Sequence, residues 1–374
     1  MGLAVPVIKQ ILKDDINLID GLDNPRQVKF SADNKLVFVV SADDNSLSIF
    51  TLDDNFDLTF DQIFKDTQTK NLPLEGASDL ITLGKNGKVL VVSFYDGSIS
   101  IFNRDTTQHY QFSEAISDNL SYDRVFDGNE PIVGLDTYGL LGAWSIIKSS
   151  DEKQVFVASY QSNAVSIFDV SECDEITLNK VITSGYANID LGNPVSLALS
   201  PSNSELFVAG YEKHKLTVFS RKLGGEWVVK QVIQTEVDGE ENCLNPQKIV
   251  ISQNAKVLYL ACSGSNTLAV FALVDDNYSF VQTITNSDVG GSGLSGAGSM
   301  ALSHDGAHLY AAGESDTGML LFNVEADGKL TLMKRFTFDE YSIEGVSSIA
   351  ITSDGKHLLL SLAKGDALYM LELQ

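Results

Sequence analysis

The chain has 374 residues, with 50 Asp and Glu against 26 Lys and Arg and a formal net charge of −24. Such an acidic surface makes nucleic acid and anionic membranes poor partners. No apolar stretch reaches the roughly 18 to 20 residues of a membrane span, and the first residues do not form a signal peptide. We therefore expect a soluble protein, cytoplasmic by default, and periplasmic or secreted if a leader has been removed.

The three cysteines are predicted to be free thiols. Cys262 lies within an apolar strand pattern, whereas Cys173 and Cys243 lie in polar segments, and no metal-binding spacing links them. A chain of this length can bury enough apolar surface to be stable without disulfides. The alternative is a redox pair between Cys173 and Cys243.

The N-terminal segment 5–14 is predicted to be a strand that belongs with the C-terminus. Its residues 7–12, VIKQIL, repeat the pattern of residues 228–233, VVKQVI, which form the fourth strand of a later unit. The last unit has no fourth strand of its own, because the chain stops at Gln374. We expect segment 5–14 to complete that unit and remove an exposed sheet edge.

The rest of the chain repeats one unit of short strands and turns, most clearly in residues 194–219. The third strand of each unit ends in a large apolar residue, and these residues recur every 48 to 52 positions with one interval of 66: Phe50, Phe102, Phe168, Phe219, Phe271, Phe322 and Met370. A polar turn rich in Asn, Asp and Gly separates the first two strands of each unit. Periods of this length are typical of propellers.

The predicted fold is therefore all-β: one domain, 1–374, forming a seven-bladed β-propeller of four-stranded antiparallel blades, with the N-terminal strand completing the last blade. The interval of 66 residues comes from an insertion at 114–136, between blades two and three. Insertions in repeat folds often carry function. This one holds Tyr122, Arg124 and Phe126 among acidic residues that lack the spacing of a calcium loop, so no metal site is predicted.

Three repeats carry a family resemblance. Residues 194–201 (PVSLALSP), 303–311 (SHDGAHLYA) and 352–358 (TSDGKHL) resemble the YVTN-type repeats of lactonase-like seven-bladed propellers. The resemblance implies the fold and a possible 6-phosphogluconolactonase-like activity with His, Glu and Arg at the channel mouth. None of the five histidines (His109, His214, His304, His308 and His357) aligns there, which leaves Arg26, Glu75 and Asp79 as candidates near the channel.

Two aligned sets are candidate binding residues. The first lies just ahead of the innermost strands, where the repeats carry Arg26, Asp79, Trp144, Val195, Gln247, Gly298 and Ser347. Of these, Arg26, Asp79, Trp144 and Gln247 could hold a small polar ligand, or they could simply solvate the channel. The second set follows the second strand and comprises Tyr95, Tyr160 and Tyr211, where other units have Ala42, Ser263 and Glu314. Three neighbouring tyrosines suit a protein interface or pack over strand ends.

Two classes of function stay open. The first is a non-enzymatic propeller that binds a protein partner or a small polar ligand at the channel mouth and one face. The alternative is a lactonase-like hydrolase acting on a sugar lactone or a related small acid. Whether the protein is an enzyme is left open. No catalytic residue is assigned, no cofactor is predicted, and we expect a monomer.

Overall fold

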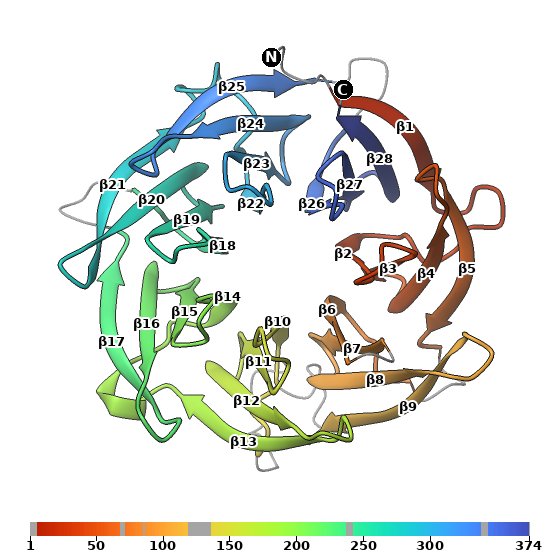
Figure 1. Cartoon of the computed structure of the whole chain (residues 1–374), viewed down its shortest axis with the longest axis horizontal. Coiled ribbons are helices and arrows are strands. Elements are labelled where there is room, and N and C mark those ends of the chain that lie inside the picture. Colours follow the sequence, from red (N-terminus) through yellow and green to blue (C-terminus); the bar gives the residue numbers. More distant parts are fainter. Residues whose placement is uncertain are drawn as a thin grey trace, which may run out of the picture.

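The structure is a computed structural model that describes residues 6–67, 72–84, 87–118, 136–236, 242–337 and 343–373. The described residues form seven four-stranded antiparallel sheets, which stand as blades around a central axis (Figure 1). One short 3-10 helix, η1 (Tyr186–Asn188), is the only helix among these residues, and none is long and apolar enough to cross a bilayer. Residues 119–135 of the predicted insertion lie outside the described residues, including Tyr122, Arg124 and Phe126.

In the first six blades the strands follow one another in chain order from the axis outward, and in the last blade β26, β27 and β28 are followed by β1 (Figure 1). The innermost strands are β2 (Pro25–Phe30), β6 (Ala77–Leu83), β10 (Ala143–Lys148), β14 (Pro194–Leu199), β18 (Pro246–Ile251), β22 (Ala297–Leu302) and β26 (Val346–Ile351). The second strands are β3 (Leu36–Ser41), β7 (Lys88–Ser93), β11 (Gln154–Ser159), β15 (Glu205–Gly210), β19 (Val257–Cys262), β23 (His308–Gly313) and β27 (His357–Leu362).

The outer two strands of each blade have six to nine residues. The third strands are β4 (Ser46–Leu52), β8 (Ser98–Arg104), β12 (Ala164–Val170), β16 (Lys215–Arg221), β20 (Thr267–Val274), β24 (Met319–Val324) and β28 (Ala367–Leu373). The outermost strands are β5 (Leu58–Lys65), β9 (Tyr110–Ser117), β13 (Ile176–Thr183), β17 (Trp227–Gln234), β21 (Asn277–Thr285), β25 (Leu330–Phe336) and β1 (Pro6–Lys13).

The predicted closure of the ring is confirmed. Strand β1 pairs antiparallel with β28, from Pro6 opposite Leu373 to Lys13 opposite Ala367. The two ends of the chain therefore share the last blade and lie near each other in Figure 1. The edge of β28, which would otherwise present unpaired backbone groups, is covered.

The hydrophobic cores lie between neighbouring blades. Tyr259 and Val270 of blade five, for example, pack in one cluster with Leu309 and Phe322 of blade six. The large apolar residue near the end of each third strand is at most 2% exposed in all seven blades. This burial explains the regular spacing of those residues in the sequence, because each blade needs a bulky side chain to fill the space against its neighbour.

In six of the seven blades the turn between first and second strands begins with a Ser or Thr whose hydroxyl bonds to the side chain two residues on. In blade one the Ser31 hydroxyl donates to Asp33 at 2.6 Å and accepts the backbone N–H of Leu36 at 2.9 Å. Ser303 and Asp305 make the same bond in blade six, also at 2.6 Å. The fourth residue of the turn has a positive φ, as at Asn34 (54°), which is why Asn and Gly recur there.

Glutamine side chains link the outermost strands of several neighbouring blades. The Gln10 amide donates to the Leu58 carbonyl at 2.9 Å and accepts the Leu58 N–H at 2.7 Å. Equivalent pairs join Gln62 to Tyr110, Gln231 to Tyr278 and Gln282 to Leu330. Each glutamine satisfies both backbone groups at the start of the next blade's outermost strand, so it fixes how neighbouring blades stand against each other.

Candidate functional site at the mouth of the central channel

A β-bulge shapes the start of every innermost strand. The pairing with the second strand skips one residue in each blade, for example between Pro25 and Gln27. Bulges re-aim side chains, and the seven bulged residues all line one cavity at the mouth of the channel: Arg26, Ser78, Trp144, Val195, Gln247, Gly298 and Ser347. The predicted convergence of Arg26, Trp144 and Gln247 is thus what the structure shows.

Asp79 does not hold the position predicted for it. The bulged residue of blade two is Ser78, and Asp79 is the next residue along. Its side chain is only 6% exposed, although it also borders the mouth cavity. The carboxylate accepts hydrogen bonds from the Leu80 N–H at 2.8 Å, the Ile146 N–H at 3.1 Å and the Ser145 hydroxyl at 3.2 Å. Asp79 therefore ties β6 to β10, and its acceptor capacity is largely used within the fold.

Serines take the same role elsewhere in the ring. The Ser196 hydroxyl accepts the Ile249 N–H at 3.1 Å, and Ser348 accepts the Val28 N–H at 3.5 Å. In each case the residue after the bulge holds the innermost strand of the following blade. This comparison supports a structural role for Asp79.

A second set of side chains borders the mouth together with several of the bulged residues. It comes from the residue that directly follows each second strand, which is Phe94 in blade two, Tyr160 in blade three, Tyr211 in blade four, Ser263 in blade five and Glu314 in blade six. All five border an open hollow of about 420 Å³ together with Arg26, Trp144, Val195 and Gln247.

Tyr95 does not belong to this second set, because it lies one residue after Phe94. Phe94 occupies the position equivalent to Tyr160 and Tyr211, whereas the Tyr95 ring is 41% exposed and lies against Gly76. Tyr95 touches Phe94 edge-on, with 5.3 Å between ring centroids, but it does not border the hollow. The predicted row of three tyrosines is therefore a row of one phenylalanine and two tyrosines.

Aromatic rings form a continuous wall on one side of the hollow. Phe94 contacts Trp144 edge-on at 5.4 Å and Tyr160 at 6.3 Å, and Tyr160 contacts Tyr211 at 6.4 Å. The Tyr160 hydroxyl donates to the Glu212 carboxylate at 2.5 Å. Such a wall offers flat, apolar area with a polar edge, which suits the C–H face of a sugar-like ring.

An ion pair lies beside this wall. The Arg26 guanidinium of blade one is bonded to the Glu314 carboxylate of blade six, and its central carbon lies 5.9 Å from the centroid of the Trp144 ring. Both charged side chains are partly exposed, at 21% and 31%. The mouth therefore holds a cation, a carboxylate and aromatic faces within one hollow.

Glu314 was not predicted from the sequence as a site residue. The available signal was its place in the repeat, since an acid stands where two other blades have tyrosine. Glu75, which was a candidate, borders neither cavity at the mouth.

None of the five histidines borders the mouth cavities. His304 lines the opposite end of the channel, where its Nε2 lies 2.9 Å from the Thr352 carbonyl oxygen. His357 is only 7% exposed and stacks on Phe56 with 3.9 Å between ring centroids.

His214 has a structural position in the loops around the mouth. Its Nδ1 accepts the Asn245 N–H at 3.0 Å, just ahead of β18. In blade three, Asn163 accepts the Asn193 N–H at 2.9 Å, and in blade five Asn266 accepts the Gly296 N–H at 2.7 Å. These acceptors all have a positive φ in the turn between second and third strands. His214 thus replaces asparagine in a repeated bond that positions the start of the next blade.

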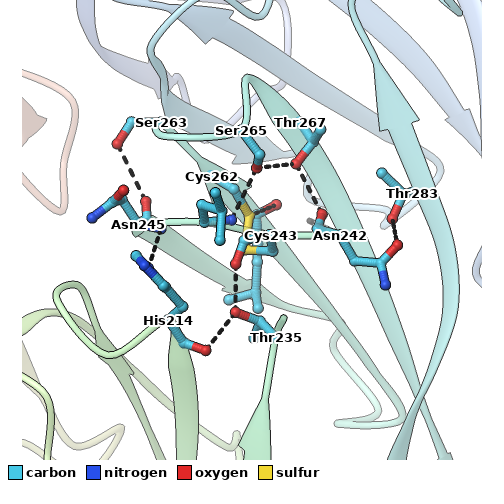
Figure 2. The surroundings of a disulfide bond; sticks show 12 residues. His214, Thr235, Asn242, Cys243, Asn245, Cys262, Ser263, Ser265, Thr267 and Thr283 are labelled. Atoms are coloured by element: carbon cyan, nitrogen blue, oxygen red, sulfur yellow. Dashed lines mark hydrogen bonds between the residues drawn. A yellow bond between two sulfur atoms is a disulfide. The ribbon is translucent and has the colours of Figure 1, made fainter. Parts of the chain in front are cut away.

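A disulfide joins Cys243 to Cys262, contrary to the prediction of free thiols (Figure 2). Their Cα atoms are 5.2 Å apart, and both residues are fully buried. The bond links the loop before β18 to the end of β19, next to Ser263 at the mouth. Cys173 is free and exposed, so the alternative pair of Cys173 with Cys243 is also wrong. A separation of 19 residues gives no local sign of this contact.

Three carboxylates gather near the N-terminal strand. One oxygen from each of Asp14, Asp20 and Asp44 lies within 4.8 Å of the others. Lys65 already bonds to both Asp20 and Asp44, and although burial opposes its charge, these two acids raise its pKa. The lysine balances the cluster, which we interpret as structural.

The comparisons with known proteins agree with the architecture. The family described as Lactonase, 7-bladed beta-propeller, matches residues 143–374, more than half of the chain, and the protein belongs to this family. Similar solved structures include a candidate 6-phosphogluconolactonase from Bacteroides uniformis (18% identity, TM-score 0.65, 87% of each chain covered). Another, from Bacteroides fragilis, has 16% identity, TM-score 0.64, and 93% and 89% coverage of this chain and that chain.

A periplasmic gluconolactonase from Pseudomonas aeruginosa is similar to the same degree, with 16% identity, a TM-score of 0.61 and 87% of each chain covered. At such identities the likeness shows the shared fold. The chemistry has to be argued from the residues at the mouth.

Proposed function

We propose that this protein is a hydrolase that opens a lactone ring at the mouth of the central channel. The observation that carries the proposal is the Arg26–Glu314 ion pair beside the Trp144 ring, within a hollow walled by aromatic residues. Membership of the lactonase family and the likeness to gluconolactonases support this choice of reaction.

Each of these residues has a separate role in the proposed reaction. The ring of a sugar lactone would lie against the Trp144 and Tyr160 faces, with its hydroxyl groups directed toward the Gln247 amide and the Ser263 hydroxyl. Arg26 would donate hydrogen bonds to the lactone carbonyl oxygen, where negative charge develops during attack. Among the described residues, Glu314 is the one carboxylate that borders both mouth cavities, and it can act as a general base beside that cation.

The proposed hydrolysis requires only water and these side chains. Glu314 takes a proton from water as the oxygen of that water bonds to the carbonyl carbon. The bond between that carbon and the ring oxygen then breaks, and the proton passes from Glu314 to the departing ring oxygen. The product is an open hydroxy acid; its carboxylic acid group then releases the second proton of the water to solvent, and the resulting carboxylate would be paired with Arg26.

A second candidate is a propeller that binds a ligand or a protein partner without turnover. The specific observation in its favour is the aromatic wall formed by Phe94, Trp144, Tyr160 and Tyr211, which offers binding area and no catalytic group. Loss of capture of a partner by Tyr160→Ala and Tyr211→Ala proteins would support it.

Two measurements on the wild-type protein separate these candidates. The first follows acid release from a panel of γ- and δ-aldonolactones and an open-chain ester, above the uncatalysed rate. The second follows tryptophan fluorescence while the corresponding hydroxy acid is added. Trp144 lies at the mouth and Trp227 is buried in the core, so Trp144→Phe tests whether the fluorescence change arises from binding at the mouth.

A hydrolase predicts acid release from at least one lactone and a fluorescence change that Trp144→Phe removes. A fluorescence change without acid release would favour the binding protein. Acid release that leaves Trp144 fluorescence unaltered at saturating product would place the reaction elsewhere and contradict the proposal.

A further inference from the structure

A second cavity opens at the end of the channel opposite the mouth. Its volume is about 380 Å³, and the turns between first and second strands surround it, including Asn34, His304 and Ser353. The innermost strands of blades one, five, six and seven form its walls. None of the residues in the proposed lactone mechanism borders it.

Two lysines extend into this cavity from different blades. Lys29 comes from β2 and Lys248 from β18, and both line the cavity. Neither ammonium group forms an ion pair within the described part of the chain. In a protein of net charge −24, two unpaired cations in one internal space are an unusual concentration of positive charge.

The surroundings leave this charge uncompensated. Burial lowers the pKa of Lys248, and the positive charge of the nearby Lys29 lowers it further, as expected for two cations that line one cavity. Asp79 acts in the other direction. Its carboxylate already accepts three hydrogen bonds, and Lys248 borders both this cavity and the mouth cavity that Asp79 borders.

The remaining polar lining can also donate hydrogen bonds. The hydroxyl of Ser299 and the hydroxyl of Ser348 border the same cavity, and Ser348 uses its oxygen to accept the Val28 N–H, which leaves its hydrogen free to donate. No carboxylate is among the described residues that line this cavity, and cations together with hydroxyl donors are the chemistry of an oxyanion site.

We propose that this end of the channel binds a small oxyanion with at least two negative charges, held between the Lys29 and Lys248 ammonium groups. Such a ligand satisfies both cations at once and relieves their mutual repulsion. Inorganic phosphate and a short dicarboxylate share this chemistry. The proposal does not depend on the lactone-opening function, because Lys29 and the cavity that it lines lie outside the proposed catalytic residues.

The test is calorimetric titration of the intact protein with inorganic phosphate, and separately with succinate, at constant ionic strength set with sodium chloride. We expect saturable binding of at least one of the two, at one site per chain. Lys29→Met and Lys248→Met should each weaken that binding by about tenfold or more, because each removes a charge-assisted contact. Whichever ligand binds more tightly identifies the source of the oxyanion.

Three matched variants complete the design. Lys222→Met removes an exposed lysine far from the cavity and should leave binding unchanged. Lys29→Arg and Lys248→Arg keep the charge and should retain binding within a few-fold, which separates loss of charge from loss of folding. The proposal is overturned if neither anion binds, if Lys29→Met and Lys248→Met bind as the wild type does, or if Lys222→Met weakens binding equally.

Discussion

His214 is a histidine in a position where other blades have asparagine. Its Nδ1 accepts one backbone N–H from the loop ahead of β18. We expect His214→Asn to keep the stability of the wild type, because the Asn163 and Asn266 amides make the same bond. His214→Ala leaves the Asn245 N–H without this acceptor and should lower the free energy of unfolding by about 1 to 2 kcal/mol. Urea denaturation measures both, and equal losses would contradict the assignment.

Asp96 should make stability depend on pH. Burial raises its pKa to about 6, and Glu75 and Asp66 add to the effect, although the Glu75 N–H bond at 2.6 Å opposes it. The unfolded chain releases this proton near pH 4. Between about pH 4 and 6 the folded protein therefore holds more protons, and the contribution of Asp96 to stability is lost as pH rises through that window.

Asp96→Asn tests this directly. The amide stays neutral, so the variant should be more stable than the wild type at pH 7.5 by about 1 to 2 kcal/mol, allowing for partial solvent screening. Below pH 4 Asp96 is protonated in both the folded and the unfolded wild-type chain, so the two proteins should have nearly equal free energies of unfolding. Denaturation curves at both pH values provide the comparison, and a gain that does not change with pH would refute the shifted pKa.

Single residues also mark where sequence reasoning failed. The repeat brought Arg26, Trp144 and Gln247 to one position, but in blade two it was wrong by one residue at two places. Strand β6 has seven residues where the other innermost strands have six, which moved the alignment from Ser78 to Asp79. At the second place, Tyr95 was aligned with Tyr160 and Tyr211 because all three are tyrosines, although Phe94 holds the equivalent backbone position.

At the level of elements, the closing strand is the most consequential. Deletion of residues 1–14 removes β1 and exposes the edge of β28. We expect the free energy of unfolding to fall by at least about 3 kcal/mol, since Ile8 and Ile11 also pack into the core of the last blade. Thermal unfolding and light scattering should show a lower Tm and aggregation.

A synthetic peptide of residues 1–14 serves as the control, because added in trans it should restore part of the lost stability. Unchanged Tm and solubility after the deletion would contradict closure by β1.

The disulfide gives a prediction for blade five. Thiol titration of the unfolded, unreduced chain should find one reactive cysteine, Cys173, and reduction should bring the number to three. Reduction should lower the free energy of unfolding by about 3 kcal/mol, the value for a closed loop of this length. Cys173→Ser should have no such effect, whereas three thiols before reduction would exclude the bond.

Strands, turns and ring closure could be predicted because their signals are local: alternating residues, Asn and Gly turns, and a repeated segment such as 7–12. The disulfide and the Gln10 contact with Leu58 could not, since they join parts of the chain that only the finished ring brings together. The Arg26–Glu314 pair belongs to the same class, as its partners come from blades one and six.

At the scale of the whole molecule, seven similar blades form one site whose residues differ from blade to blade. Every blade supplies a bulged residue to the mouth of the channel, and blades two to six also supply the residue after their second strand. Because these positions do not carry strand pairing, their identities vary from blade to blade. A cation, a carboxylate and an aromatic wall are thereby collected at the mouth, and two lysines at the opposite end.

The most direct measurement of the central claim is kcat/KM for the best lactone substrate, compared between wild type and Glu314→Gln. The amide keeps the shape of the side chain but cannot accept a proton from water, so kcat should fall by about 100-fold or more with little change in KM. Glu212→Gln, next to the same hollow, is the matched control and should retain most of the activity. A Glu314→Gln protein that turns over the lactone at the wild-type rate would contradict the account.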